Sequence, residues 1–546
     1  MNEEILNIKN EIYSFPKSFD FFKSNDFASA SYKLTCDIEE IFLGLLSTEV
    51  VFSNYDKIGI WQDKFRGGYR TALKWAYDYC VDTDNRFQPL LCKYEFASCN
   101  HIISEAQRFN NIRNCFERVD LGKLKVKLID GKHIKFDLPA SSRSINADLY
   151  ARWIDHESYG DIEKKKTLKY DEKTFVHMIA PEYKGVWNDF SKTPIDTQLF
   201  SRVYRDCLNK IKFDTEDYSN INFGLFTLDD FEKVYATLMA LGIMNFNYQR
   251  KLREKNSSLK GNIPIVFSEI SLLIQFIYDN SKVKRKAAKC ILELLSYNPE
   301  FHKDKITIVQ PLFSFGKFIF YSPSLLYYSE AVDKLLYLIK EQNNMPEVIS
   351  KIAKEREQVM TERLVHYISE KSNLKCVSNY KLTNNGLPIA EFDILIYDNN
   401  TNSLLLTELK HFFKADGEAG HQKVDFKIRD SIKSRLSKQL LAEKHIDTLF
   451  GEAFEISNLS TLPKIKSCIV SQNYSGSSFL DDKIAIFDEF LFKHTLSRYN
   501  YRLGDLFDSI DSDSYIPDMS KNISYHDYTE GYAGYKITYP GLVQKT

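Results

Sequence analysis

Hydrophobic side chains recur at helical spacing through most of the first 340 residues of the chain. Residues 32–52 and 285–297 place apolar side chains three or four positions apart, which is typical of helices with one buried face. The apolar stretch 263–278 contains Glu269 and Gln275, so it falls short of a membrane-spanning helix and is interpreted as a buried helix. The pattern predicts a mostly helical N-terminal region.

Two segments of this region follow the two-residue period of strands instead. Residues 123–138 alternate on both sides of Asp130 and Gly131, a dipeptide typical of a tight hairpin turn. Residues 306–322 contain a second candidate strand pair, and the polar stretch 253–264 is interpreted as a loop. We therefore expect some β structure among the helices.

The pattern changes after 340–348, where Asn343, Asn344 and Pro346 end one helix and begin another. The expected order is then helix, three strands, helix and two strands, at about 347–371, 374–382, 390–398, 403–410, 421–446, 465–473 and 483–490. This order is typical of an α/β domain with a mixed sheet. We predict a mostly helical region of one or two subdomains at 1–345 and an α/β domain at 346–546.

Composition narrows the class of protein. The 546 residues are 43% hydrophobic and 27% charged, which is a globular balance and enough chain for about two to four domains. The formal net charge of -1 means that any nucleic-acid-binding surface must be local. Nine cysteines without a Cys-x-x-Cys pair argue against a disulfide framework or a zinc ribbon. The acidic segment 1–15 lacks the apolar core of a signal peptide, so we expect a soluble cytoplasmic protein with no membrane partner.

The two strands expected at 390–398 and 403–410 carry unusual polar residues. Both strands are apolar on both faces, so we expect them in the middle of the sheet. Nevertheless, they contain the carboxylates Glu391, Asp393 and Glu408. Carboxylates near a sheet core need a compensating partner, and this requirement points to a functional site.

The turn between these strands sets the expected register. If Asp398 lies opposite Ser403, Asp393 lies directly opposite Glu408, with Cβ atoms about 4.5–5.5 Å apart. Two carboxylates that close repel each other, and a divalent cation between them would remove the conflict. Oxygen ligands favour Mg²⁺ or Mn²⁺, and the main-chain carbonyl of Leu409 could supply another oxygen.

Lys410 lies two residues beyond Glu408 on the same face of the strand, and the same register places it opposite Glu391. A lysine in this position can orient or deprotonate an attacking water, or stabilise the charge of a phosphate. Together, the carboxylates and the lysine predict a site for metal-dependent hydrolysis of phosphodiester bonds.

The motif resembles that of the PD-(D/E)XK nuclease superfamily, whose fold is called restriction-endonuclease-like. Asp393 is followed, after fourteen residues, by Glu408-x-Lys410, and the order of elements around these residues over 355–490 is similar. Phe392 stands where the proline that gives the family its name would be. The resemblance implies that Asp393, Glu408 and Lys410 are catalytic, that Asp393, Glu408 and Leu409 bind Mg²⁺, and that the substrate is nucleic acid.

The family also implies roles for two helices. A glutamate on the helix before the sheet often joins the metal ligands, and Glu362 is the candidate, with Glu355 as the alternative. The helix after the motif often directs a polar residue into the site, so Gln439 could hold the scissile phosphate or a water, and Arg435 could contact the nucleic-acid backbone. That helix has apolar residues at four-residue steps: Val424, Ile428, Ile432, Leu436 and Leu440. Polar residues on the solvent-exposed side of a helix are the alternative explanation for Glu362, Arg435 and Gln439.

Three other polar features have simpler explanations. His411 points away from Lys410 and is expected to pack beneath the site, and His366 is more typical of a core or surface histidine than of a ligand. The basic segment 282–289 is interpreted as a solvated helix end.

The resemblance implies a Mg²⁺-dependent nuclease, with DNA favoured over RNA. A large accessory region without the phosphate-binding loop of an ATPase is similar to that of prokaryotic antiphage defence effectors. Residues 1–345 would then sense a signal, or bind a separate partner protein or the substrate, and a homo-oligomer is compatible with the sequence. Two alternatives stay open: a nucleic-acid-binding module with an inactive nuclease fold, and a protein-interaction scaffold in which Lys410 neutralises Glu391 and Asp393.

Overall fold

The computed structural model describes the chain in segments. They are residues 2–46, 64–80, 96–138, 149–150, 197–214, 221–255, 265–297, 310–327, 329, 335, 338–339, 346–411, 417–457, 459, 461–472, 484–521 and 523–544. Parts of the predicted elements, including 47–52, 256–264 and 341–345, lie outside these segments.

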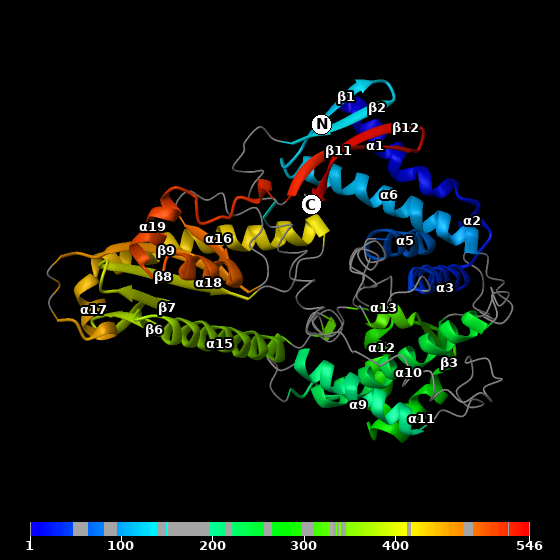
Figure 1. Cartoon of the computed structure of the whole chain (residues 1–546), viewed down its shortest axis with the longest axis horizontal. Helices are drawn as coiled ribbons and strands as arrows, with labels where there is room; N and C mark the ends of the chain where they lie inside the picture. Colours follow the sequence, from blue (N-terminus) through cyan, green and yellow to red (C-terminus); the bar gives the residue numbers. More distant parts are fainter. Residues whose placement is uncertain are drawn as a thin grey trace.

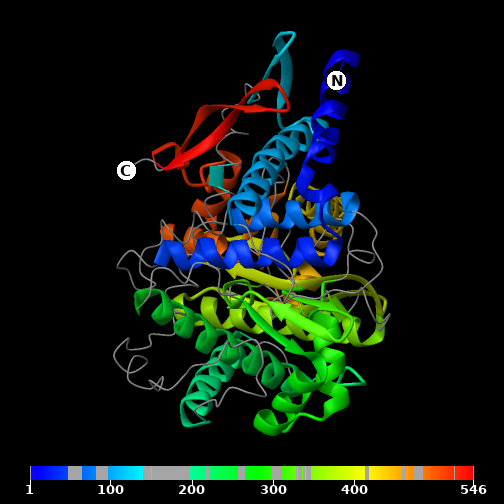
Figure 2. The same cartoon turned by 90° about the vertical axis from the view of Figure 1, so that its right-hand side faces the viewer.

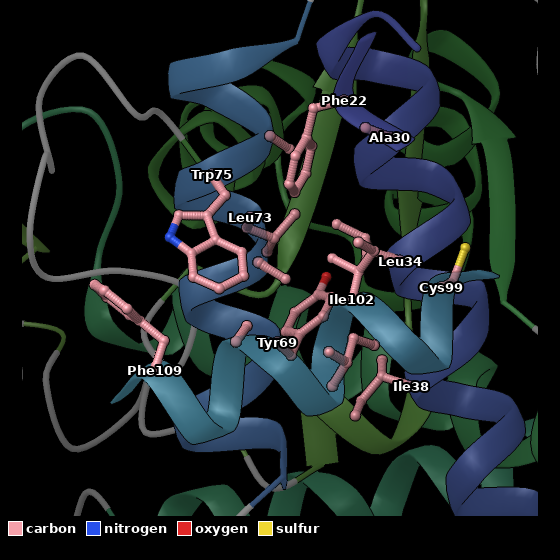
Figure 3. Packing of buried hydrophobic residues seen from close by; sticks show 14 of the residues in the cluster. Phe22, Ala30, Leu34, Ile38, Tyr69, Leu73, Trp75, Cys99, Ile102 and Phe109 are labelled. Carbon is pink, nitrogen blue, oxygen red and sulfur yellow. The ribbon is translucent and has the colours of Figure 1, made fainter. Parts of the chain in front are cut away.

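Helices build the first part of the chain, as the hydrophobic spacing predicts. They are α1 (Glu3–Ser14), α2 (Asp20–Lys23), α3 (Phe27–Leu46), α5 (Arg70–Tyr79) and α6 (Phe96–Asp120), with the short turns η1 (Phe15–Ser18) and η2 (Lys64–Tyr69). Figure 3 shows Leu34 of α3, Leu73 of α5 and Ile102 of α6 meeting in their shared apolar cluster. Gly68 permits η2 to approach α6, because a Cβ there would lie 2.4 Å from the carbonyl oxygen of Ile103.

A second group of helices forms the middle of the chain. They are α9 (Thr197–Asp214), α10 (Leu228–Lys255), α11 (Ile270–Ser281), α12 (Arg285–Leu295) and α13 (Pro323–Tyr327). A small sheet with the strand order β3 (Val266–Glu269), β5 (Phe318–Tyr321), β4 (Leu312–Phe315) lies against them. Ile319 on one face of this sheet packs on the second group, and Phe320 on the other face packs on the first group. The sheet therefore joins the two groups of helices.

The apolar stretch 263–278 differs from its prediction as one buried helix. Residues Val266–Glu269 are strand β3, which pairs antiparallel with β5, and the helix begins only at Ile270. A continuous apolar run suits a strand covered on both faces as well as it suits a buried helix, so periodicity could not separate the two. The strand pair predicted within 306–322 is confirmed as β4 and β5.

The hairpin predicted at 123–138 is confirmed, and it belongs to a larger sheet. The strands of this sheet are β1 (Lys125–Asp130), β2 (His133–Asp137), β11 (Ile523–Tyr532) and β12 (Tyr535–Gln544). Their order is β1-β2-β12-β11, with β12 parallel to β2 and antiparallel to β11. The β11–β12 hairpin lies beside the β1–β2 hairpin in both views of the molecule (Figures 1 and 2).

The β11–β12 hairpin is also part of the N-terminal core. Tyr532 and Ile537 are buried in the same apolar cluster as the helices α1 to α6. Lys135 of β2 donates a 2.7 Å hydrogen bond to Asp527 of β11. Residues 523–544 therefore pack on the N-terminal region, although in sequence they follow the α/β unit.

The order of elements predicted after residue 345 is confirmed. The elements are α15 (Pro346–Lys371), β6 (Lys375–Asn384), β7 (Leu387–Asp398), β8 (Ser403–Lys410), α16 (Gly417–Lys444), α17 (Ile446–Phe454), β9 (Lys464–Ser471), β10 (Ala485–Asp488), α18 (Glu489–Arg498), α19 (Leu503–Asp511) and η5 (Met519–Lys521). The strand order is β10-β9-β8-β7-β6, with β8, β9 and β10 parallel and β6, β7 and β8 antiparallel. The sheet is therefore mixed, and β7 and β8 lie inside it, as their apolar faces predict.

Helices cover both faces of this sheet (Figure 1). One face packs on α15, α18 and α19, and the other packs on α16 and α17. Two contacts tie the unit to the N-terminal region: the Tyr150 hydroxyl donates a 3.0 Å hydrogen bond to Asp488, and Lys123 lies 3.9 Å from Asp425 of α16. Among the residues that the structure describes, no helix is long and apolar enough to cross a membrane.

Candidate metal-dependent active site

Asp393 and Glu408 lie where strands β7 and β8 separate. The antiparallel pairing runs from Asp398 opposite Ser403 to Ile394 opposite Thr407, which confirms the predicted register. Asp393 and Glu408 occupy the next two positions, where this pairing has ended.

The Asp393 side chain takes the place of a strand-to-strand bond at this point. Its Oδ2 accepts a 2.6 Å hydrogen bond from the main-chain N–H of Leu409. Because the N–H and C=O of one residue in a strand point to the same side, the Leu409 carbonyl also faces this opening.

Glu408 is surrounded by cations. Its Oε1 accepts a 2.7 Å hydrogen bond from Lys410 Nζ, and its Oε2 accepts bonds from the Arg435 guanidinium and, at 3.1 Å, from Lys438 Nζ. The Arg435 side chain is fully buried, whereas Lys410 and Lys438 keep 30% and 24% of their side-chain surface exposed. Both lysines can therefore reach a ligand in solvent, and Arg435 cannot.

The two carboxylates differ in pKa. Burial raises the pKa of Asp393 to about 6, with a further increase from the nearby charge of Glu408. Burial also opposes ionisation of Glu408, but Arg435, Lys410 and Lys438 outweigh it and hold its pKa at about 2. Among the described residues, Asp393 forms no ion pair, and Lys410 offsets its charge less than burial and Glu408 oppose it.

A third carboxylate approaches from α15, and it is not the predicted one. The pKa of Glu357 is raised by burial, while Lys410 lowers it and Glu408 raises it, so Glu357 lies beside the cluster. Glu362 is exposed, and its carboxylate accepts a 2.7 Å hydrogen bond from Gln358. Five residues correspond to a rotation of about 140° around a helix, so Glu357 and Glu362 point in different directions. Glu355 is turned about 200° from Glu357 by the same geometry.

Helix α16 contributes residues other than the predicted Gln439. The Gln439 side chain donates a 3.0 Å hydrogen bond to Glu443 of its own helix. Arg435, expected to contact a nucleic-acid backbone, is instead buried against Glu408 and the ring of Phe392, with 5.4 Å between the guanidinium carbon and the ring centroid. The structure therefore brings Arg435 and Lys438 to the site and leaves Gln439 outside it.

The sequence predicts Glu391 opposite Lys410 if the pairing of β7 with β8 continues beyond Ile394 and Thr407. The pairing stops there, and Glu391 does not face Lys410. Strands β7 and β8 have separated at this point, and Glu391 instead pairs across the sheet with Lys381 of β6, 4.0 Å away. Lys410 forms its ion pair with Glu408. The pairing of Lys410 with Glu391 and Asp393, which the scaffold alternative assumed, is thus absent among the described contacts.

The two histidines have the simple environments expected of them. His411 packs beneath the site, where burial, with Arg356 and Arg363 nearby, lowers its pKa to about 3. His366 is exposed on α15, with its Nε2 3.2 Å from Glu370.

The oxygen atoms at this opening match the chemistry of a hard divalent cation. Asp393, Glu408 and the Leu409 carbonyl are the donors present, and the pKa of Asp393 is raised first by burial and then by the charge of Glu408, both of which a cation would offset. No three acidic, histidine or cysteine side chains of the described segments form a complete metal cage. A site with two carboxylates fits Mg²⁺, which usually keeps several waters and binds substrate phosphates.

Comparison with protein-family models, with curated proteins and with solved structures finds no match to this chain. What can be said of the site therefore depends on its own geometry. That geometry has three parts: a carboxylate held by the main chain, a second carboxylate neutralised by cations, and a partly exposed lysine between them and solvent.

Proposed function

We propose that the α/β unit is a metal-dependent nuclease that hydrolyses phosphodiester bonds of nucleic acid, with DNA favoured over RNA. One observation carries this proposal. Asp393 and Glu408 lie together where β7 and β8 separate, and Lys410 ends β8 beside them. Burial of the Asp393 carboxylate costs stability, and carboxylates with a raised pKa are common at functional sites. Binding a cation that in turn binds a phosphate is such a function.

Each residue would have a distinct role in this reaction. Asp393, Glu408 and the Leu409 carbonyl would hold Mg²⁺ or Mn²⁺. Such an ion, when bound, polarises the phosphate and lowers the pKa of a coordinated water. Lys410, which is partly exposed, would orient the attacking water or offset the charge that develops on the phosphate. Arg435 is a positioning residue, because it is buried and acts through Glu408.

The N-terminal region would control this activity. Strand β2 shares a sheet with β12, which follows the α/β unit in sequence, so the two parts of the chain are connected by more than the covalent link into α15. We infer a sensing, partner-binding or substrate-binding role for this region, within an antiphage defence function. This assignment is by analogy with other accessory regions attached to nucleases.

A protein-interaction scaffold is the second candidate, because one observation favours it. Three cations already neutralise Glu408, as in a structural ion-pair network. Binding of Mn²⁺ separates the two functions, since a ligand that binds the native state raises its melting temperature and a scaffold without a metal site would show no rise.

Cleavage by the purified full chain is the direct test. Plasmid DNA, linear duplex, single-stranded DNA and RNA are incubated with Mg²⁺, with Mn²⁺ or with a chelator. We expect metal-dependent cleavage that Lys410→Ala reduces by at least about 100-fold, in the range for loss of a general acid or base. The matched control is Lys381→Ala, which removes an exposed lysine that pairs with Glu391 on the same sheet and should leave cleavage unchanged.

Three negative results together would contradict the proposed nuclease. If no substrate is cleaved, if Mn²⁺ leaves the melting temperature unchanged, and if Asp393→Ala makes no difference to this response, the metal site is ruled out. The scaffold function would then replace the nuclease.

A further inference from the structure

We propose that the exposed side of α18 binds an unpaired stretch of the nucleic-acid substrate, with Phe490 stacking on a base. This inference rests on the proposed nuclease function and deepens it, because it assigns a preference for single-stranded or locally opened nucleic acid.

Helix α18 begins at the edge of the sheet where the candidate site lies, although it covers the opposite face from α16. Strand β10 ends at Asp488, and the next residue, Glu489, accepts two hydrogen bonds from Arg363 of α15, at 2.9 and 2.6 Å. Lys410 ends β8 opposite Ser471 of β9, and Ser471 lies opposite Asp488 of β10, so α18 begins two strands away from Lys410 at the same edge of the sheet. A strand of nucleic acid with its phosphate at Lys410 would therefore pass the start of α18.

The charge on α18 suits a polyanion. Glu489 is the acidic residue of this helix, and it is buried and paired with Arg363 and Lys493. The side that faces solvent carries His494 and Arg498, and Lys493 keeps 25% of its side chain exposed. Basic groups without an exposed acid among them follow the phosphates of a single strand.

Phe490 supplies the aromatic surface. It is 57% exposed, and its ring stacks on the ring of His494, with 6.1 Å between centroids and 20° between planes. One exposed phenylalanine alone would be ordinary. Here a second ring supports it, basic side chains flank it, and the helix that carries it begins at the same sheet edge as the candidate site. Because the bases of a duplex already stack on each other, this ring would recognise an unpaired base.

Binding of defined oligonucleotides tests the inference. The full chain carrying Lys410→Ala, which should slow cleavage at least about 100-fold, is titrated with Mg²⁺ present into a single-stranded oligonucleotide containing 2-aminopurine, and into a blunt duplex of equal length. We expect stacking to quench the 2-aminopurine. We expect Phe490→Ala, added to this chain, to weaken single-strand binding roughly tenfold, in the range known for loss of one stacked base. Phe490→Tyr should retain the affinity, and duplex binding should change little.

Two further variants make the comparison specific. Phe426→Ala is the matched control, because Phe426 is an equally exposed phenylalanine, 66% accessible, on α16. It should leave single-strand binding unchanged. Lys493→Ala should lower the slope of log affinity against log salt by roughly 0.7, the value for one phosphate contact. Arg363 would still hold Glu489 in that variant, so the helix should stay folded.

The outcomes distinguish this inference from the nuclease itself. Unchanged single-strand affinity in Phe490→Ala, or an equal loss for Phe426→Ala or for the duplex, overturns the stacking surface, while cleavage dependent on Lys410 would leave the nuclease standing. Binding dependent on Phe490 without any cleavage supports the surface and leaves a nucleic-acid-binding module. Binding to neither oligonucleotide overturns the surface.

Discussion

Asp393 and Glu408 illustrate how position within a few ångströms sets the behaviour of one chemical group. Glu408 has three cationic partners and a pKa of about 2, so it is ionised at any physiological pH. Asp393 has one main-chain N–H, neighbouring carboxylates and a pKa of about 6. The charge of Asp393 is therefore the one that is unfavourable for folding.

The raised pKa of Asp393 predicts a stabilising substitution. The folded chain holds this proton more tightly than the unfolded chain, so the ionised form is destabilising above pH 6, and the effect vanishes below the unfolded pKa near 4. Asp393→Asn, in metal-free buffer, should raise the free energy of unfolding by roughly 1–3 kcal/mol at pH 8, and by much less at pH 4–5. Denaturant unfolding at the two pH values measures the difference. A loss of stability at pH 8 would contradict the assigned charge state.

At the scale of elements, α16 connects the sheet core to the site. Arg435 extends from the buried side of this helix to Glu408, and Lys438, one turn later, reaches the same carboxylate. A fully buried guanidinium is stable only while its partner stays ionised, so the helix and strand β8 depend on each other.

Removal of the buried charge of Arg435 should lower the free energy of unfolding, and removal of the charge of Glu408 as well should reverse part of this loss. Arg435→Met should destabilise the α/β unit by roughly 3–5 kcal/mol, because Glu408 loses its buried partner. The double variant Arg435→Met with Glu408→Gln should recover much of that stability, because the charges that then lose a partner, on Lys410 and Lys438, are partly exposed to solvent. Cleavage should be lost in both variants. Comparison of the single and double variants by denaturant unfolding measures the coupling, and additive effects would show that the pair does not interact.

The sequence predicted the order of elements in the α/β unit well, and the side-chain directions on its helices less well. The apolar residues of α16 were read at four-residue steps, but each such step turns about 40° beyond a full circle. After four steps Leu440 has left the buried face, and it is 66% exposed. The buried side follows Ile428 to Arg435 to Ala442 instead, in steps of seven. Hydrophobicity does not reveal a charged residue on that side, so the sequence predicts Gln439 at the site and assigns Arg435 to the nucleic-acid backbone instead of to the buried side.

The same reasoning explains Glu357. The buried side of α15 carries Met360, Leu364 and Ile368, and Glu357 continues this side toward the N-terminus of the helix. The sequence does not show which side of α15 faces the sheet to within a few residues, so it predicts Glu362 in place of Glu357. By contrast, Asp393, Glu408 and Lys410 were found because strands alternate strictly and the turn at Asp398 and Ser403 fixed the register.

At the scale of the whole molecule, the sequence boundary near 345 does not separate two independent bodies. Tyr532 and Ile537, almost two hundred residues beyond that boundary, complete the apolar cluster of the N-terminal helices. No local pattern could have predicted this, because parallel pairing of β2 with β12 depends on contacts between distant segments. The prediction of 346–546 as one unit captured the sheet β6 to β10 and could not capture the last hairpin.

The shared sheet predicts a long-range effect of one substitution. Ile537 is fully buried in the N-terminal cluster, so Ile537→Ala should destabilise that region by roughly 2–5 kcal/mol. Ile129→Ala is the matched control, because Ile129 belongs to the same sheet and is 51% exposed. Amide hydrogen exchange should accelerate in α6 and β2 of the first variant and stay unchanged in the second. Equal protection in both variants would show that the hairpin contributes little to the core.

The pairing of β2 with β12 also has a consequence for the growing chain on the ribosome. About 400 residues separate the two strands in sequence. At ordinary rates of translation, their synthesis takes roughly 20–80 s. During this interval β2 presents an open edge, which is the kind of edge that pairs wrongly with neighbouring chains. The N-terminal core can therefore close only after the α/β unit has been made, and we expect nascent chains to require protection by chaperones until residues 523–544 emerge.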